Sequence, residues 1–199
     1  MLLNQGIVVK AGATPDVVNV YLSQVRDTEE THKADLSYPD EPEKPVQITR
    51  IQILDSDGNP SLKHDLFHPI RLELDFVTRR FFPNLYVACT VCTLMNQIVF
   101  STNEMDWTNY TEPEMKGIFP KEPGQYKASV VFPAPLLQQG VYELWINLSD
   151  LKTVGGIGRR RGIFIEIADD CGSFASFPFK REGILAIPLQ WQVEQVGKI

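Results

Sequence analysis

Two segments alternate apolar and polar side chains without interruption, and this alternation limits the fold more than any other feature of the chain. Every second residue is apolar from Ile70 to Phe76, and again from Tyr142 to Leu148. A period of two places one face of a strand in the core and the other face outside. Turn residues separate further expected strands at 46–54, 84–93, 97–101, 126–132, 162–167 and 183–193. With almost no helical period after residue 24, this pattern predicts an all-β protein, an antiparallel sandwich of the immunoglobulin-like or jelly-roll type.

The chain begins with a segment of different character. Residues 6–10 predict a short strand, followed by a glycine turn and a helix with Thr14 as N-cap and Pro15 at its first position. This segment is too small to bury a core of its own, although it could be the ordinary N-terminal helix of a single domain. Residues 25–46 are acidic, rich in proline and poor in apolar side chains, so they predict an extended linker.

Composition narrows the classes of function. The 199 residues carry a net charge of -6, which disfavours nucleic acid as a partner because phosphate attraction dominates that binding. No apolar run approaches the roughly 20 residues that span a bilayer, and the N-terminus does not resemble a signal peptide. The three cysteines form no disulfide framework. A cytoplasmic location is therefore expected.

Several short motifs occur in an order that matches a known family. They are I-x-x-I-x-I-L-D-x-D-G at 48–58, P-N-L-Y-V at 83–87, P-G-Q-Y at 123–126, L-x-x-G-x-Y-x-L at 137–144 and R-E-G-I-L-x-I-P-L-x-W at 181–191. Together they resemble the C-terminal carbohydrate-binding domain of the ATP-binding protein of O-antigen polysaccharide ABC exporters, the Wzt type. Residues 1–24 resemble the C-terminal end of an ABC nucleotide-binding domain. The resemblance implies three parts: this remnant at 1–24, the linker at 25–46 and a carbohydrate-binding sandwich at 47–199.

The resemblance also implies a function and partners. The domain would recognise the end of a lipid-linked O-antigen polysaccharide at the inner face of the bacterial inner membrane. It would form a homodimer that exchanges the C-terminal strand containing Trp191. The domain would be connected to the membrane subunit of the transporter through the ATPase domain. No Walker motif occurs in this chain, so ATP and Mg are expected in the full-length parent and no cofactor is expected here.

Strand phase indicates where a sugar could bind. A sugar site needs an aromatic face for C–H groups, with carboxylates, amides or Arg for hydroxyl groups. Because successive side chains of a strand alternate, the residues that stand between the apolar ones are expected to point outward. Residues 103–110 predict a polar, aromatic loop that could line one side of a groove. The candidate carbohydrate-binding residues are Trp145, Asn147, Glu143, Tyr86, Thr90, Arg71, Glu73, Asp106 and Trp107.

Two other functions remain open. The chain could be a dimerisation and docking domain without a ligand, in which case Trp145 would lie in a protein interface. It could also be a carbohydrate-active enzyme, with a carboxylate pair drawn from Glu104, Asp106, Asp169 and Asp170.

Three further groups of residues have ordinary explanations. Cys89 and Cys92 are expected to point to opposite faces of a strand. His64 and His68 are four residues apart, but no helix is expected there that would place both on one face to bind a metal. Residues 159–161 are three arginines after a glycine loop. They predict a solvated hairpin tip, or contacts to acidic sugar, lipid phosphate or the ATPase body.

Overall fold

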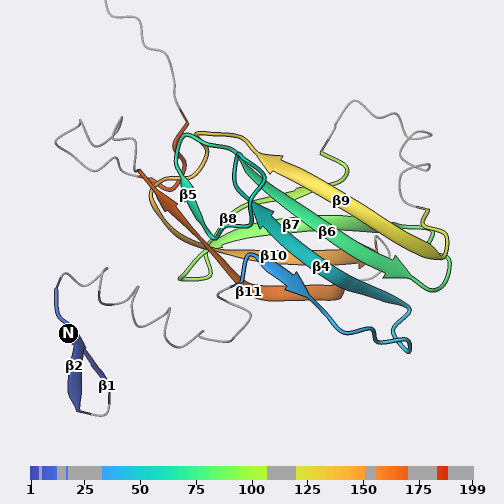
Figure 1. Cartoon of the computed structure of the whole chain (residues 1–199), viewed down its shortest axis with the longest axis horizontal. Coiled ribbons are helices and arrows are strands. Elements are labelled where there is room, and N and C mark those ends of the chain that lie inside the picture. The colour runs from blue at the N-terminus through green and yellow to red at the C-terminus, as the bar shows by residue number, and fades with distance from the viewer. Residues whose placement is uncertain are drawn as a thin grey trace, which may run out of the picture.

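The computed structural model describes residues 1–4, 6–12, 17, 33–106, 120–150, 156–169 and 183–187 (Figure 1). The strands are β1 (Leu2–Asn4), β2 (Ile7–Lys10), β3 (Asp35–Ser37), β4 (Val46–Leu54), β5 (Lys63–Asp65), β6 (Ile70–Thr78), β7 (Leu85–Thr93), β8 (Ile98–Asn103), β9 (Gly124–Phe132), β10 (Gly140–Asp150) and β11 (Gly156–Ala168). In this part of the chain, no helix is long and apolar enough to cross a membrane.

Two sheets pack face to face and form a sandwich (Figure 1). The five-stranded sheet has the order β5-β11-β10-β7-β8, and the four-stranded sheet has the order β3-β4-β6-β9. Neighbouring strands are antiparallel except for β5 and β11, which run parallel. The predicted all-β sandwich is therefore confirmed, with one parallel pair at the edge.

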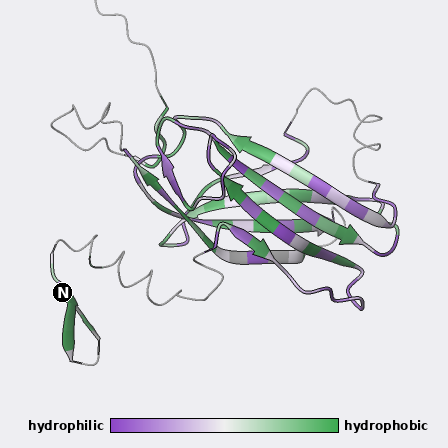
Figure 2. Ribbon diagram, viewed as in Figure 1, coloured by the Kyte–Doolittle hydropathy of each residue, from purple (hydrophilic) through white to green (hydrophobic). Residues whose placement is uncertain are grey.

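The core lies between the sheets. Hydrophilic and hydrophobic residues alternate along β6 (Figure 2), and its apolar residues belong to this core. Leu72, Leu74 and Phe76 of β6 are buried, as the alternating pattern predicts. Leu144, Ile146 and Leu148 of β10 are fully buried opposite them. Burial of apolar surface at about 25 cal/mol per Å² makes this interior the main source of stability.

The structure corrects the sequence-based boundaries at three places. Residues 35–37, expected in the linker at 25–46, form β3 and pair with β4. Gly156 to Gly158, expected in a loop, belong to β11, and so do the three arginines at 159–161, which do not form a hairpin tip. Sequence reasoning also missed β1 and β5, whose three-residue lengths give too few positions to establish a period.

Two expected elements fall largely outside the described residues. The predicted helix after Thr14 is described only at Val17, and the predicted strand at 183–193 is described only as far as Ile187. Within that last segment, Leu185 forms an isolated bridge with Leu137.

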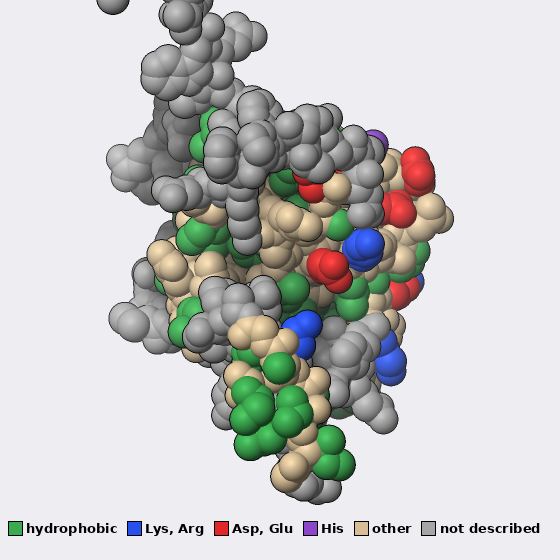
Figure 3. Space-filling model, turned by 90° about the vertical axis from the view of Figure 1, so that its left-hand side faces the viewer, with side chains coloured by type: hydrophobic (Ala, Val, Ile, Leu, Met, Phe, Trp, Pro, Cys, Tyr) green, Lys and Arg blue, Asp and Glu red, His purple; other side chains and the backbone are tan. Residues whose placement is uncertain are grey.

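The N-terminal hairpin of β1 and β2 exposes apolar side chains, visible in the lower part of Figure 3. Ile7 is 71% exposed, and Leu3, Val8 and Val9 are also exposed. A two-stranded hairpin is marginally stable on its own. The predicted short strand at 6–10 is confirmed as β2.

Candidate functional site

The outer face of the five-stranded sheet carries the tryptophan selected from the sequence. Trp145 on β10 lies directly opposite Thr90 on β7, and Thr90 lies opposite Ser101 on β8. Opposed residues on neighbouring strands share a face, so these three side chains form one row across the sheet. In the next row, Asn147 lies opposite Ala88, and Ala88 lies opposite Asn103. We call this surface the Trp145 face, defined by Tyr86, Ala88, Thr90, Ser101, Asn103, Trp145 and Asn147.

The row through Trp145 combines an aromatic ring with hydroxyl groups. The Thr90 and Ser101 hydroxyl oxygens lie 2.9 Å apart and share a hydrogen bond. Trp145 is partly exposed, and Ser101 is exposed. Thr90, Ser101 and Ala88, the neighbours of the indole on β7 and β8, have small side chains. The arrangement offers an apolar surface next to donors and acceptors, which is what a sugar ring requires.

Two of the predicted site residues are buried although they lie on the outer face. Glu143 is 6% exposed and Asn147 is 7% exposed. Glu143 Oε1 accepts a hydrogen bond from the backbone N–H of Gly162, with 3.0 Å between the two atoms. At least one oxygen of the Glu143 carboxylate is therefore hydrogen-bonded to β11.

Tyr86 and Asp106 lie at the ends of the strands that form this surface. Tyr86 is partly exposed and lies opposite Ser149, one row beyond Asn147. Asp106 follows β8 and is exposed, and its carboxylate Oδ2 accepts a hydrogen bond from the Asn103 backbone N–H at 3.0 Å. Trp107 lies outside the described residues.

Arg71 and Glu73 do not join the other predicted residues. They lie on β6, and their strand phase turns them to the outer face of the four-stranded sheet, across the sandwich from Trp145. There Glu73 forms an ion pair with Lys127, with 2.6 Å between oxygen and nitrogen. The prediction of a single site that includes Arg71 and Glu73 is therefore wrong in its geometry. Alternation separates inside from outside but does not say to which sheet a strand belongs.

The central part of the chain matches a known family. A family model described as "Wzt C-terminal domain" matches residues 43–155, which is more than half of the chain. The chain belongs to the Wzt C-terminal domain family. The predicted resemblance to the Wzt C-terminal domain is thereby confirmed over residues 43–155. No curated protein matches the chain.

Solved structures agree with the fold expected for a Wzt C-terminal domain. A crystal structure of the C-terminal domain of wzt superposes with a TM-score of 0.57 at 13% identity, covering 81% of this chain and 89% of the other. A Niemann-Pick type C2 protein from Japanese carpenter ant gives a TM-score of 0.42 at 11% identity, covering 67% of this chain and 100% of the other. The first similarity supports the sandwich fold, and the second is too distant to carry an argument.

Membership in the Wzt C-terminal domain family supports a carbohydrate-binding role within an ABC exporter, and the family is one of binding domains rather than catalysts. The carboxylate Glu104, considered for an enzyme, forms an ion pair with Lys121 at 3.0 Å and accepts the Val87 backbone N–H at 3.3 Å. Both contacts fix the position of the Glu104 side chain, as expected for a structural group.

Cys89 and Cys92, two of the three cysteines of the chain, are buried in this Wzt C-terminal domain. Cys89 lies opposite the core residue Ile146, and Cys92 lies opposite Glu143, so they point to opposite faces as predicted. Burial raises the pKa of Cys89 to about 12, so its thiol stays protonated and packs as a small apolar group. Among the described residues, no cluster of three potential ligands could hold a metal ion.

Proposed function

We propose that this Wzt C-terminal domain binds the end of a lipid-linked O-antigen polysaccharide on the Trp145 face and couples it to export. The observation that carries the proposal is the row of Trp145, Thr90 and Ser101, which places a partly exposed indole beside paired hydroxyl groups. The domain would act at the cytoplasmic face of the inner membrane. It would reach the transporter through an ATPase domain that binds ATP and Mg, and this chain itself would need no cofactor.

The geometry of the Trp145 face suggests how a sugar would be held. The indole would cover the C–H face of one sugar ring, while Ser101, Thr90 and Asn103 would exchange hydrogen bonds with its hydroxyl groups. A shallow site of this kind is expected to bind weakly, at about -4 to -8 kcal/mol, which corresponds to millimolar to micromolar dissociation constants.

Calorimetric titration with the cognate polysaccharide tests the proposal. Trp145→Ala removes the stacking surface, and we expect it to lower the affinity at least tenfold. Phe81→Ala is the matched control, because Phe81 is a 50% exposed aromatic residue between β6 and β7 and not on the Trp145 face. Equal affinity of the Trp145→Ala variant and the wild type would place the glycan elsewhere.

The partners of the domain extend this proposal. We expect a homodimer that exchanges the C-terminal strand containing Trp191, a residue outside the described part of the chain. Two copies would present two Trp145 faces and raise avidity for a repeating glycan. The alternative, a docking domain without a ligand, predicts that Trp145→Ala changes the oligomeric state in light scattering. Glycan recognition predicts that it changes only binding.

A further inference from the structure

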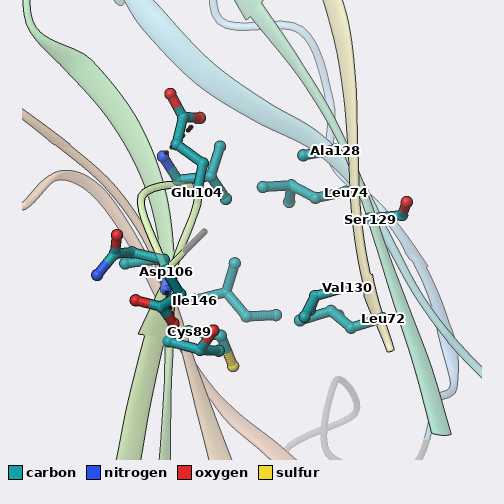
Figure 4. Close-up of a pocket in the computed structure, with 13 residues that line it drawn as sticks. Leu72, Leu74, Cys89, Glu104, Asp106, Ala128, Ser129, Val130 and Ile146 are labelled. Atoms are coloured by element: carbon teal, nitrogen blue, oxygen red, sulfur yellow. Dashed lines mark hydrogen bonds between the residues drawn. The ribbon is translucent and has the colours of Figure 1, made fainter. Parts of the chain in front are cut away.

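A cavity of about 140 Å³ lies between the two sheets at the edge formed by β8 and β9. Leu72, Leu74 and Val130 point into it from the four-stranded sheet, and Cys89 and Ile146 face them from the five-stranded sheet (Figure 4). The cavity therefore lies on the inner side of the same strands that carry the Trp145 face on their outer side. Its walls are mainly apolar.

Small side chains between two aromatic pairs explain why this space is not filled. On one side, Phe100 of β8 meets Phe132 of β9, with 5.9 Å between the ring centroids. On the other side, Tyr126 of β9 stacks on Phe76, with 5.1 Å between the centroids. Between these pairs, β9 contributes only Ala128 and Val130 to the inner face, and β8 contributes Thr102.

The end of the cavity beside β8 is polar and acidic. Thr102, Glu104 and Asp106 line it there. The charge of Glu104 is balanced by Lys121, at 3.0 Å. Asp106 is exposed, and no ion pair within the described part of the chain includes it. A ligand would therefore meet an apolar interior and a carboxylate at the entrance.

We propose that this cavity is a second binding site, for a ligand that carries a compact apolar group next to a cationic or hydroxyl group. A cavity of about 150 Å³ holds one benzene molecule, so the apolar group would contain about six carbon atoms. It would replace empty space between Ala128, Ile146 and Leu72, and its polar group would reach Asp106 at the entrance. An anionic group at the same position would be repelled by Asp106.

A set of three probes tests both halves of this proposal. Benzylamine, benzyl alcohol and benzoate share the ring and differ in the charge beside it. Titration followed by NMR shifts of the methyl groups of Leu72, Leu74, Val130 and Ile146 should give saturable binding of benzylamine and benzyl alcohol, with benzoate at least tenfold weaker. Asp106→Asn should remove the difference between benzylamine and benzoate while benzyl alcohol binds as before.

A cavity-filling variant distinguishes binding inside this cavity from binding elsewhere on the protein surface. Ala128→Leu should fill the space, raise Tm and weaken benzyl alcohol at least tenfold. Val131→Leu is the matched control, because Val131 lies on β9 but is 52% exposed and does not line the cavity. Absence of methyl shifts in the wild type, or equal binding by the Ala128→Leu variant, would overturn the proposal. Glycan binding at Trp145 should survive Ala128→Leu, so failure of one proposal leaves the other intact.

Discussion

The carboxylate of Glu143 accepts a hydrogen bond from the backbone N–H of Gly162, across the pair of strands β10 and β11. The pairing of these strands shifts register between Leu144 and Ile146, and Gly162 lies at that irregularity with a φ of 82°. Only glycine adopts such a backbone conformation without strain. Glu143 thus accepts a hydrogen bond from the Gly162 amide at the point where the regular pairing of β10 and β11 is interrupted.

Replacement of Glu143 should therefore lower stability. Glu143→Ala leaves the Gly162 amide without this acceptor, and we expect a loss of about 1–3 kcal/mol in the free energy of unfolding. Glu143→Gln keeps an oxygen acceptor and should lose less. Urea unfolding measures both variants. If Glu143→Ala kept full stability and lost only glycan binding, the carboxylate would be a ligand of the sugar instead.

Strand phase was enough to predict which side chains leave the core. The alternation around Trp145 and around Arg71 assigned both to outer faces, and both assignments are confirmed by the pairing of β10 and β6. Phase is a local property of the strand, because successive side chains must alternate. The phase of a strand can therefore be predicted from its own sequence, without knowledge of the rest of the fold.

The order of strands in the sheets could not be predicted in the same way. Arg71 and Trp145 belong to different sheets, a difference set by long-range pairing that no short motif encodes. The pairing of Thr90 with Ser101 was missed for the same reason, although both residues lie in strands that the sequence predicted. The burial of Glu143 was also missed, because an acidic residue in an outward position is normally exposed.

The hydroxyl group of Thr90 offers a second test of the Trp145 face. Thr90→Val keeps the shape of the side chain and removes the hydroxyl that lies 2.9 Å from Ser101. We expect polysaccharide affinity to fall by about threefold to tenfold, the usual effect of one hydrogen bond. Ser129→Ala, a hydroxyl deletion on the opposite sheet, should leave the affinity unchanged in the same titration. The reverse result would move the site to the four-stranded sheet.

Arg160 connects the two sheets at the edge away from the cavity. Its guanidinium carbon lies 3.8 Å from the ring centroid of Tyr38, which follows β3. Cation–π contacts contribute about 0.5–2 kcal/mol. Arg160→Ala should lower the free energy of unfolding by about 1 kcal/mol in urea, and Arg160→Lys should lower it less. Glycan affinity should not change, and a large fall in affinity at unchanged stability would instead favour the alternative of a contact to acidic sugar.

His64 should make the stability of the domain depend on pH. The side chain is 4% exposed in β5, and burial lowers its pKa below the ordinary value of 6.5, against smaller opposing effects of Ser61 and Asp55. Below pH 6.5 the unfolded chain therefore binds a proton that the folded chain does not. Stability should fall as pH drops from 6.5 toward the lower pKa of the folded state, by at most about 1.4 kcal/mol per pH unit.

Urea unfolding at a series of pH values measures this slope. His64→Gln should flatten it. The hydrogen bond from Arg50 lowers the pKa of Asp35 below its ordinary value of 3.8, so the stability that this pair adds is lost only at more acidic pH. The effect of His64 on stability thus falls in a higher pH range than the effect of the Arg50–Asp35 pair. A slope between pH 6.5 and 5 that persisted in His64→Gln would assign the proton to another group.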